Sequence, residues 1–303
     1  MRANAGRFTV RHRVFGMLAT AGALGALVAL SVPVAGQGGV GAPAAPASTR
    51  PIPRLSNGKP DLTGIWAKNT LNTPVAGVPA GARVDSLGGS MLAEGVRTRP
   101  LTPFGRWRYN QRLHEVNPQV WCWPPGVPRI DWQEPYPVEF LQRPDRLIMA
   151  YEFSHNFRVA PTDGRQHPAD LAPTYLGHSV GYWEGDTLVL DVRGFTDNTW
   201  LDIYGNPHSG QMRVVERFTR TAYDQLEFQF TIEDPTIYTR PWTSTKRVWP
   251  LARPEWNVME YSCTSFNRVL TDSGGGFAAA GNAPGRDVLE EAAPQGAGPG
   301  RGR

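Results

Sequence analysis

The chain of 303 residues carries 31 Lys and Arg against 27 Asp and Glu, which gives a formal net charge of +4. Four arginines near the N-terminus carry a charge equal to this excess, so the rest of the chain has a net charge near zero. They are Arg2, Arg7, Arg11 and Arg13. A balanced chain without clustered basic residues lacks the electrostatic footprint of a nucleic-acid-binding protein. We therefore expect no nucleic-acid partner.

The N-terminal segment has the three parts of a secretory signal peptide. Its arginines precede an apolar run over 14–32, and the small residues Val34-Ala35-Gly36 follow. This order predicts cleavage after Gly36, so that 1–36 is a signal peptide and the mature chain is periplasmic or secreted without stable membrane insertion. An uncleaved anchor is the alternative, because the apolar run is just long enough to span a bilayer when tilted.

Composition divides the remaining chain into three parts. Residues 37–52 and 272–303 are rich in Gly, Ala and Pro, which predicts a flexible linker and a disordered tail. The segment 53–271 is long enough for a single domain with its own core. Its two cysteines, Cys122 and Cys263, are expected to form a disulfide in an oxidising compartment, and two separate buried thiols are the alternative.

After a possible first strand at 61–66, the predicted elements are a helix and then a series of strands. Thr102–His114 reads as the helix, with Thr102 as its N-cap and Pro103 at the first helical position. Alternation of apolar and polar residues then predicts strands over 146–153, 180–192, 212–218, 226–232, 243–249 and 258–263. Within 180–192, Glu184-Gly185-Asp186 is typical of a hairpin turn.

Consecutive antiparallel strands joined by short turns predict an all-β fold with little helix. We expect an up-and-down antiparallel β-barrel with long loops and one short helix, and a β-sandwich is the alternative. Gly64-Ile65-Trp66 resembles the Gly-x-Trp start of the first strand in lipocalins and their calycin relatives. That resemblance implies a calycin-like barrel whose tryptophan plugs the closed end.

Several longer stretches resemble a family of exported bacterial proteins of the acidobacterial and sphingomonad type. The matching stretches are PDLTGIW (60–66), CWPPGVPR (122–129), WEGDTLVL (183–190), GFTDNTWLD (194–202), PHS (207–209) and ERF (216–218). The resemblance implies one exported domain with a shared site. It implies no particular reaction.

The segment 194–209, GFTDNTWLDIYGNPHS, is the first candidate for that site. It follows a predicted strand, so in a barrel it would lie at the rim. We assign His208 as a general acid or base oriented by Asp197 or Asp202, because an unperturbed histidine titrates near neutral pH. In the same segment, Asn198 and Trp200 are candidate ligand contacts. A purely structural turn is the alternative, since Asp and Asn favour turns.

Two further catalytic candidates lie on predicted strands. His178 stands where a strand begins and is assigned as a second proton carrier. Glu216 alternates in step with apolar residues, which places a carboxylate on an apolar face. We expect Glu216 to be either functional or paired with an inward arginine such as Arg240 or Arg247.

The other candidate ligand contacts combine aromatic and polar side chains: His155, Arg158, Tyr238 and Trp242. Strict alternation would place His155 on the same face as Phe153. Many aromatic residues in one domain either fill the core or line a cavity for a flat apolar molecule. The histidines lack the spacing of strong metal motifs, and no phosphate-binding loop is present, so we expect neither a metal nor a cofactor.

Three functions fit this sequence. The first is an exported protein that binds a small apolar or aromatic molecule in its cavity. The second is a cofactor-independent acid/base enzyme, namely a lyase, isomerase or hydrolase acting on such a molecule. The third is a structural envelope protein without a ligand, because one fold can host all three.

Overall fold

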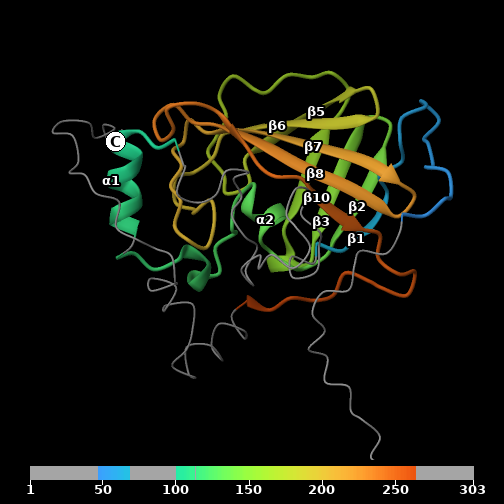
Figure 1. Ribbon diagram of the computed structural model, residues 1–303, viewed down its shortest axis with the longest axis horizontal. Coiled ribbons are helices and arrows are strands. Elements are labelled where there is room, and N and C mark those ends of the chain that lie inside the picture. Colours follow the sequence, from blue (N-terminus) through green and yellow to red (C-terminus); the bar gives the residue numbers. More distant parts are fainter. Residues whose placement is uncertain (1–46, 69–99, 113, 264–303) are drawn as a thin grey trace, which may run out of the picture. The chain divides into compact units, whose positions relative to one another are not determined.

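The computed structural model describes residues 47–68, 100–112 and 114–263 (Figure 1). The predicted signal peptide, most of the linker and the predicted tail lie outside the described residues. The helices are α1 (Pro103–Arg112), η2 (Pro118–Trp121), α2 (Arg129–Trp132) and η3 (Phe153–His155). The strands are β1 (Gly64–Trp66), β2 (Val138–Arg143), β3 (Arg146–Tyr151), β4 (Phe157–Pro161), β5 (His178–Glu184), β6 (Thr187–Arg193), β7 (Arg213–Ala222), β8 (Gln225–Glu233), β9 (Trp242–Thr243) and β10 (Arg247–Pro250).

The strands form two antiparallel sheets, which confirms a mostly β fold. One sheet has the order β1-β2-β3-β4, and the other has the order β10-β8-β7-β6-β5 with β9 paired to β8. The predicted hairpin is present as β5 and β6, with Glu184 opposite Thr187 in the register. Neighbours in sequence are therefore mostly neighbours in space, as the alternation pattern predicts.

The inner faces of the two sheets pack on each other. Phe140 of β2 meets Phe218 of β7 edge to face, with ring centroids 5.5 Å apart. The short helix α2 contacts both sheets, because Trp132 packs on Phe230 of β8 while Asp131 accepts a hydrogen bond from the hydroxyl of Tyr151 in β3. Side chains that point inward from the two sheets therefore share one core with those of α2.

The two sheets meet differently along their two pairs of edges. At one pair, the amide of Ala67 donates to the carbonyl of Pro250 (2.9 Å), and the amide of Ala252 donates to that of Ile65 (2.8 Å). At the other pair, β4 and β5 contact each other without forming a ladder. Pairing between the described strands thus yields two sheets and no fully closed barrel.

Two strand predictions were wrong in their extent. The predicted strand 243–249 is divided into β9 and β10, with residues 244–246 between them. The predicted strand 146–153 ends at Tyr151, because η3 turns the chain through left-handed conformations at Ser154 (φ 56°) and His155 (φ 48°). The turn breaks the alternation, so Phe153 is buried, whereas the side chain of Phe157 is 70% exposed. His155 is exposed and does not share a core face with Phe153.

The segment 258–263 forms no strand, contrary to the prediction. Its amides are bonded to side chains of the η3 region instead of a neighbouring strand. The amide of Met259 donates to Oε2 of Glu152 (3.0 Å), and that of Tyr261 donates to Nε2 of His155 (2.8 Å). An alternating pattern predicts a strand only where a free strand edge is available to pair with it.

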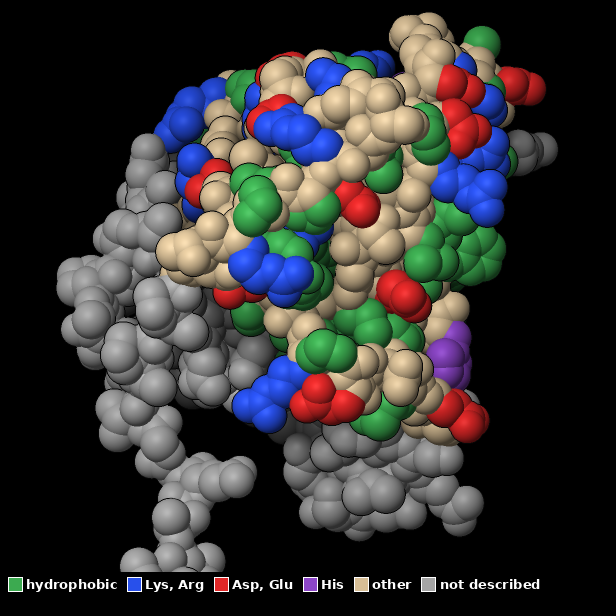
Figure 2. Space-filling view, turned by 90° about the vertical axis from the view of Figure 1, so that its right-hand side faces the viewer, with side chains coloured by type: hydrophobic (Ala, Val, Ile, Leu, Met, Phe, Trp, Pro, Cys, Tyr) green, Lys and Arg blue, Asp and Glu red, His purple; other side chains and the backbone are tan. Residues whose placement is uncertain are grey.

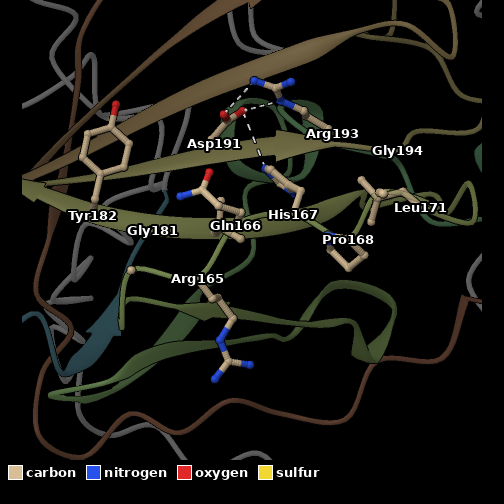
Figure 3. A pocket seen from close by; sticks show the side chains of 13 residues that line it. Arg165, Gln166, His167, Pro168, Leu171, Gly181, Tyr182, Asp191, Arg193 and Gly194 are labelled. Atoms are coloured by element: carbon tan, nitrogen blue, oxygen red, sulfur yellow. Dashed lines mark hydrogen bonds and ion pairs between the residues drawn. The ribbon is translucent and has the colours of Figure 1, made fainter.

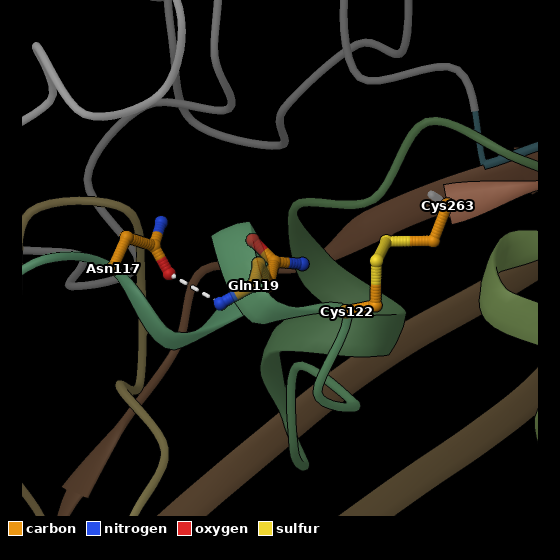
Figure 4. Close-up of a disulfide and its surroundings, with 4 residues drawn as sticks. All are labelled: Asn117, Gln119, Cys122 and Cys263. Carbon is orange, nitrogen blue, oxygen red and sulfur yellow. Dashed lines mark hydrogen bonds between the residues drawn. A yellow bond between two sulfur atoms is a disulfide. The ribbon is translucent and has the colours of Figure 1, made fainter. Parts of the chain in front are cut away.

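Two other local predictions are confirmed. Thr102 caps α1, since its hydroxyl accepts the amide hydrogen of Gly105 at 2.9 Å. Cys122 and Cys263 form the predicted disulfide, which links the residue after η2 to the end of the described chain (Figure 4). Among the described residues, no helix is both long enough and apolar enough to cross a bilayer.

Candidate functional site

A pocket of about 740 Å³ lies between the outer face of β5 and β6 and the segment 164–171 (Figure 3). Alternation along the strands selects the side chains on this face: Tyr182 and Asp191 point outward, whereas Ser179 and Leu190 point inward. The residues that line it are Gly164, Arg165, Gln166, His167, Pro168, Ala169, Leu171, Val180, Gly181, Tyr182, Asp191, Arg193 and Gly194. We call it the outer pocket.

Two histidines and an aspartate form a chain beside the outer pocket. The Nδ1 atoms of His167 and His178 are 2.9 Å apart, so one of them must carry the hydrogen between them. Nε2 of His167 lies 3.9 Å from Oδ1 of Asp191, and Figure 3 shows the two side chains turned toward each other. The nearby carboxylate of Asp191 favours the tautomer of His167 that carries its hydrogen on Nε2. The Nδ1 atom of His167 is then the acceptor, and Nδ1 of His178 is the donor.

Electrostatics keep the aspartate of the outer pocket charged and the histidine neutral. Burial lowers the pKa of His167 more than the nearby Asp191 raises it. Burial would raise the pKa of Asp191, but the hydrogen bonds from Arg213 and Arg193 outweigh it and hold that pKa below its usual value. Nε2 of His167 is itself buried and has no hydrogen-bond partner within the described chain.

The remaining wall of the outer pocket combines apolar and aromatic side chains with Arg165 and Gln166. The side chain of Tyr182 is 43% exposed, and Val180 and Leu171 are less so. Gly194 has φ 73°, and a Cβ placed there would come within 3.2 Å of Leu171, so the segment 164–171 lies close to the strand end at a position without a side chain. The pocket thus places the aromatic ring of Tyr182 beside hydrogen-bond donors from β6 and from the segment 164–171.

A second group of polar side chains lies between the sheets, and we call it the inner cluster. At its centre Arg158 of β4 donates to Oδ2 of Asp131 (3.0 Å) and to the hydroxyl oxygens of Tyr151 (3.3 Å) and Ser179 (3.0 Å). The same guanidinium contacts both carboxylate oxygens of Glu216, at 3.2 and 2.5 Å. Side chains from α2 and from three strands, β3, β5 and β7, therefore converge on one buried arginine of β4.

The pKa of Glu216 reflects this burial. Loss of solvent raises it to about 7, since the attraction of Arg158 offsets only part of the burial and the carboxyl of Asp131 adds to the rise. The inward arginine expected for Glu216 is present, but it is Arg158 and not Arg240 or Arg247. The guanidinium of Arg247 lies instead over the ring of Trp132, 4.1 Å from its centroid.

The segment 194–209 is held by bonds within itself and by bonds to Arg112, Gln133 and Asp234. Nε2 of His208 is 2.7 Å from the hydroxyl of Thr199, and burial, assisted by Arg112, lowers the pKa of His208 to about 3. Asp202 accepts the amide hydrogens of Tyr204 and Asn206 at 3.0 Å each, as an Asp in a turn does. His208 is therefore a neutral, hydrogen-bonded residue at physiological pH.

Other predicted site residues are spread over the molecule. Trp200 is buried, whereas Asp197 and Asn198 are exposed. Tyr238 donates to the carbonyl of Pro207 (2.9 Å) and meets Trp242 edge to face.

The structure thus separates the predicted catalytic residues into three places. His178 lies beside the outer pocket, Glu216 lies in the inner cluster, and His208 lies in the segment 194–209. Arg158, which was predicted as a ligand contact, lies in the inner cluster and pairs with Glu216, which was predicted as a catalytic residue.

Sequence reasoning gave no role to four residues that the structure brings into these sites: His167, Asp191, Lys68 and Asp131. Only Asp191 carries a readable signal, because it interrupts the apolar run 188–192. The others contact partners that are distant in sequence, such as Ile130 for Lys68.

The chain matches no family model, and no curated protein matches it. Across the described ranges, no group of three or more His, Cys, Asp or Glu side chains could hold a metal ion. On the described part of the face in Figure 2, acidic and basic side chains are interspersed. The function therefore has to be inferred from the outer pocket and the inner cluster.

Proposed function

We propose that the protein is an exported binding protein whose outer pocket holds a small aromatic acid. The observation that carries the proposal is His167. Its Nε2 atom is buried at the wall of a 740 Å³ pocket and has no hydrogen-bond partner in the described chain. A buried donor without a partner costs free energy, so a ligand oxygen placed there gains a bond that the protein alone leaves unmade.

Two arginines, Arg165 and Arg193, line the pocket against one carboxylate, Asp191, and this balance favours an anionic head group. Arg193 lines the pocket, and its side chain is 49% exposed although it also contacts Asp191. With hydrogen on Nε2, His167 adds a second donor near this guanidinium. A carboxylate accepts hydrogen bonds from both kinds of donor.

The apolar part of the ligand has a surface to pack on. Tyr182 presents a ring on the same face of β5 as Val180, and Leu171 lies on the facing segment. A flat ring would bury apolar area against these side chains while its acid group meets the donors. An aromatic acid is a more specific class of ligand than the small apolar or aromatic molecule expected from the sequence. The proposed site also lies on the outer face of a sheet, whereas the sequence predicted a cavity inside a barrel.

Export and a calycin-like barrel belong to the same proposal. The disulfide between Cys122 and Cys263 supports an oxidising compartment. The bonds that join β1 to the segment after β10, and the contact of β4 with β5, support a barrel in which the second seam lacks a ladder.

Calorimetric titration of the folded chain tests the binding proposal. Benzoate, 4-hydroxybenzoate and phenylacetate serve as ligands, and the corresponding amides serve as uncharged controls. We expect at least one acid to bind, with its amide at least tenfold weaker. Tyr182→Ala and Arg193→Gln should each weaken the acid at least tenfold.

Phe157→Ala is the matched control, because Phe157 is an exposed aromatic residue on β4 and lies outside the outer pocket. Its affinity should equal that of the wild type. Failure of every acid to bind, or an unchanged affinity in Tyr182→Ala, would contradict the proposed site.

A further inference from the structure

Three apolar side chains stand side by side on the outer face of the sheet β1-β2-β3-β4. Leu141 of β2 lies opposite Ile148 of β3 in the register, and Ile148 lies opposite Val159 of β4. Leu141 is 43% exposed and Val159 is 41% exposed, whereas their chain neighbours Phe140 and Ala160 are buried in the core. Alternation therefore directs the three side chains to the outer face, and we call them the apolar row.

Opposite charges flank the apolar row on β2. Glu139 precedes Leu141 by two residues and Arg143 follows it by two, so the three side chains share the outer face. Within the described chain, neither Glu139 nor Arg143 takes part in an ion pair. Arg146, which lies opposite Arg143 in the register, is bonded to Asp145 at 2.7 Å. The face thus presents an unpaired acid on one side of the row and an unpaired base on the other.

Apolar residues flank the row on β4. Phe157 and Pro161 stand two residues before and two residues after Val159, and the side chain of Phe157 is 70% exposed. Exposed apolar side chains that lie together on a folded protein indicate an interaction surface. The partner of this face must offer apolar side chains along the row, a base where it meets Glu139 and an acid where it meets Arg143.

We propose that this face binds a second copy of the chain in a two-fold symmetric dimer. The two-fold axis runs along the apolar row, so that the row of one copy lies on the row of the other. Rotation about this axis brings Glu139 of each copy over Arg143 of the partner subunit, and Phe157 over Pro161 of the partner subunit. One patch is then used twice, and each unpaired charge meets a charge of opposite sign.

The charges select this axis over the other two-fold axis that could join the same faces. An axis parallel to the strands would place β2 over β4 of the partner subunit. Glu139 would then lie over Phe157 of the partner subunit, and Arg143 over Pro161 of the partner subunit, because these residues belong to the same rows of the register. Both charges would lose water without gaining a partner, which costs free energy.

The size of the face predicts a weak and reversible dimer. Three strands spaced about 4.8 Å apart, each with five residues of about 3.3 Å, span roughly 240 Å² of sheet. The contact should therefore remain below the roughly 800 Å² that each partner buries in a stable complex. We expect monomer and dimer to exchange at micromolar protein concentrations.

Sedimentation velocity of the folded chain at low ionic strength, from about 5 to 500 µM, tests the proposal. We expect the average sedimentation coefficient to rise from that of a monomer toward that of a dimer. Glu139→Arg and Arg143→Glu each bring like charges together twice and should weaken the dimer at least tenfold. An equimolar mixture of these two variants restores both opposite pairs and should form the mixed dimer about as strongly as the wild type forms its own.

Asp170→Arg is the matched control, because it makes the same change of charge at an exposed acid outside this face. It should associate like the wild type, and circular dichroism verifies the fold of each variant. A chain that stays monomeric over the whole range overturns the proposal and leaves the face to another segment or another protein. A dimer that neither charge reversal weakens, or a mixture that fails to associate, overturns it as well. Ligand binding at the outer pocket does not enter these measurements, so a failure of the proposed aromatic-acid site leaves the result unchanged.

Discussion

The outer pocket and the inner cluster both place a carboxyl group beside an arginine, yet the pKa of the carboxyl group is lowered at one site and raised at the other. Asp191 lies on the outer face between Arg193 and Arg213, and its pKa is lowered. Glu216 contacts Arg158 between the sheets, and its pKa is raised to about 7. Burial raises the pKa at both sites. Two arginines outweigh it at Asp191, whereas Glu216 shares one arginine with the carboxyl of Asp131, which raises its pKa further.

The comparison also separates the kinds of chemistry that the two sites can support. The outer pocket keeps its charges ionised and partly exposed, which suits recognition of a charged ligand. The inner cluster holds groups whose protonation changes near neutral pH, which suits proton transfer. A single site was expected from the sequence, whereas the structure places the outer pocket and the inner cluster on opposite faces of the sheet that contains β5, β6 and β7.

The largest effect should come from removing the central cation of the inner cluster. Arg158→Leu leaves the carboxyls of Asp131 and Glu216 buried without their arginine, and we expect the free energy of unfolding at pH 8 to fall by about 3–5 kcal/mol. Arg193→Leu at the outer pocket should cost about 1 kcal/mol or less, because that side chain is half exposed. Urea unfolding of both variants measures the difference, and equal losses would contradict the comparison.

A smaller effect is expected from deleting one hydroxyl at each site. Tyr151→Phe removes a buried hydrogen bond to the carboxylate of Asp131 and should cost about 1.5–3 kcal/mol. Tyr182→Phe deletes the same group from a half-exposed ring and should change stability by less than about 0.5 kcal/mol. Thermal and urea unfolding would refute the distinction if the two variants lost stability equally.

The two sites also differ in how their contribution to stability depends on pH. Because the pKa of Glu216 is raised from 4.5 to about 7, the folded state binds more protons than the unfolded state in this range, and this contribution to stability decreases as pH rises. The lowered pKa of Asp191 gives the opposite slope: its contribution is present above the unfolded value of 3.8 and is lost as pH falls through the folded pKa.

Glu216→Gln and Asp191→Asn should each remove only the part of the pH dependence of the free energy of unfolding that the replaced residue contributes. The free energy of unfolding measured from pH 3 to pH 8 shows both, after each variant curve is subtracted from that of the wild type. A difference curve for Glu216→Gln that stays flat between pH 4.5 and 7 would contradict the raised pKa.

Local sequence patterns predicted those features whose causes are local. Period-two alternation located the hairpin of β5 and β6, and the order Thr102-Pro103 located the start of α1, because a strand face and a helix cap depend on neighbouring residues. The pairing of Cys122 with Cys263 followed from there being two cysteines in a chain expected to be exported. The same reasoning failed at 258–263, where the partner of the segment is not a strand.

The sequence by itself determined that Glu216 would stand on an apolar face and need a positive partner. Only the tertiary structure decided that the partner is Arg158, that Asp131 and Lys68 join it, and that His208 is buried apart from them. The physical reason is that alternation fixes the direction of a side chain within its own strand. Which distant strand or helix faces that side chain, and how much solvent is lost there, depends on the packing of the two sheets.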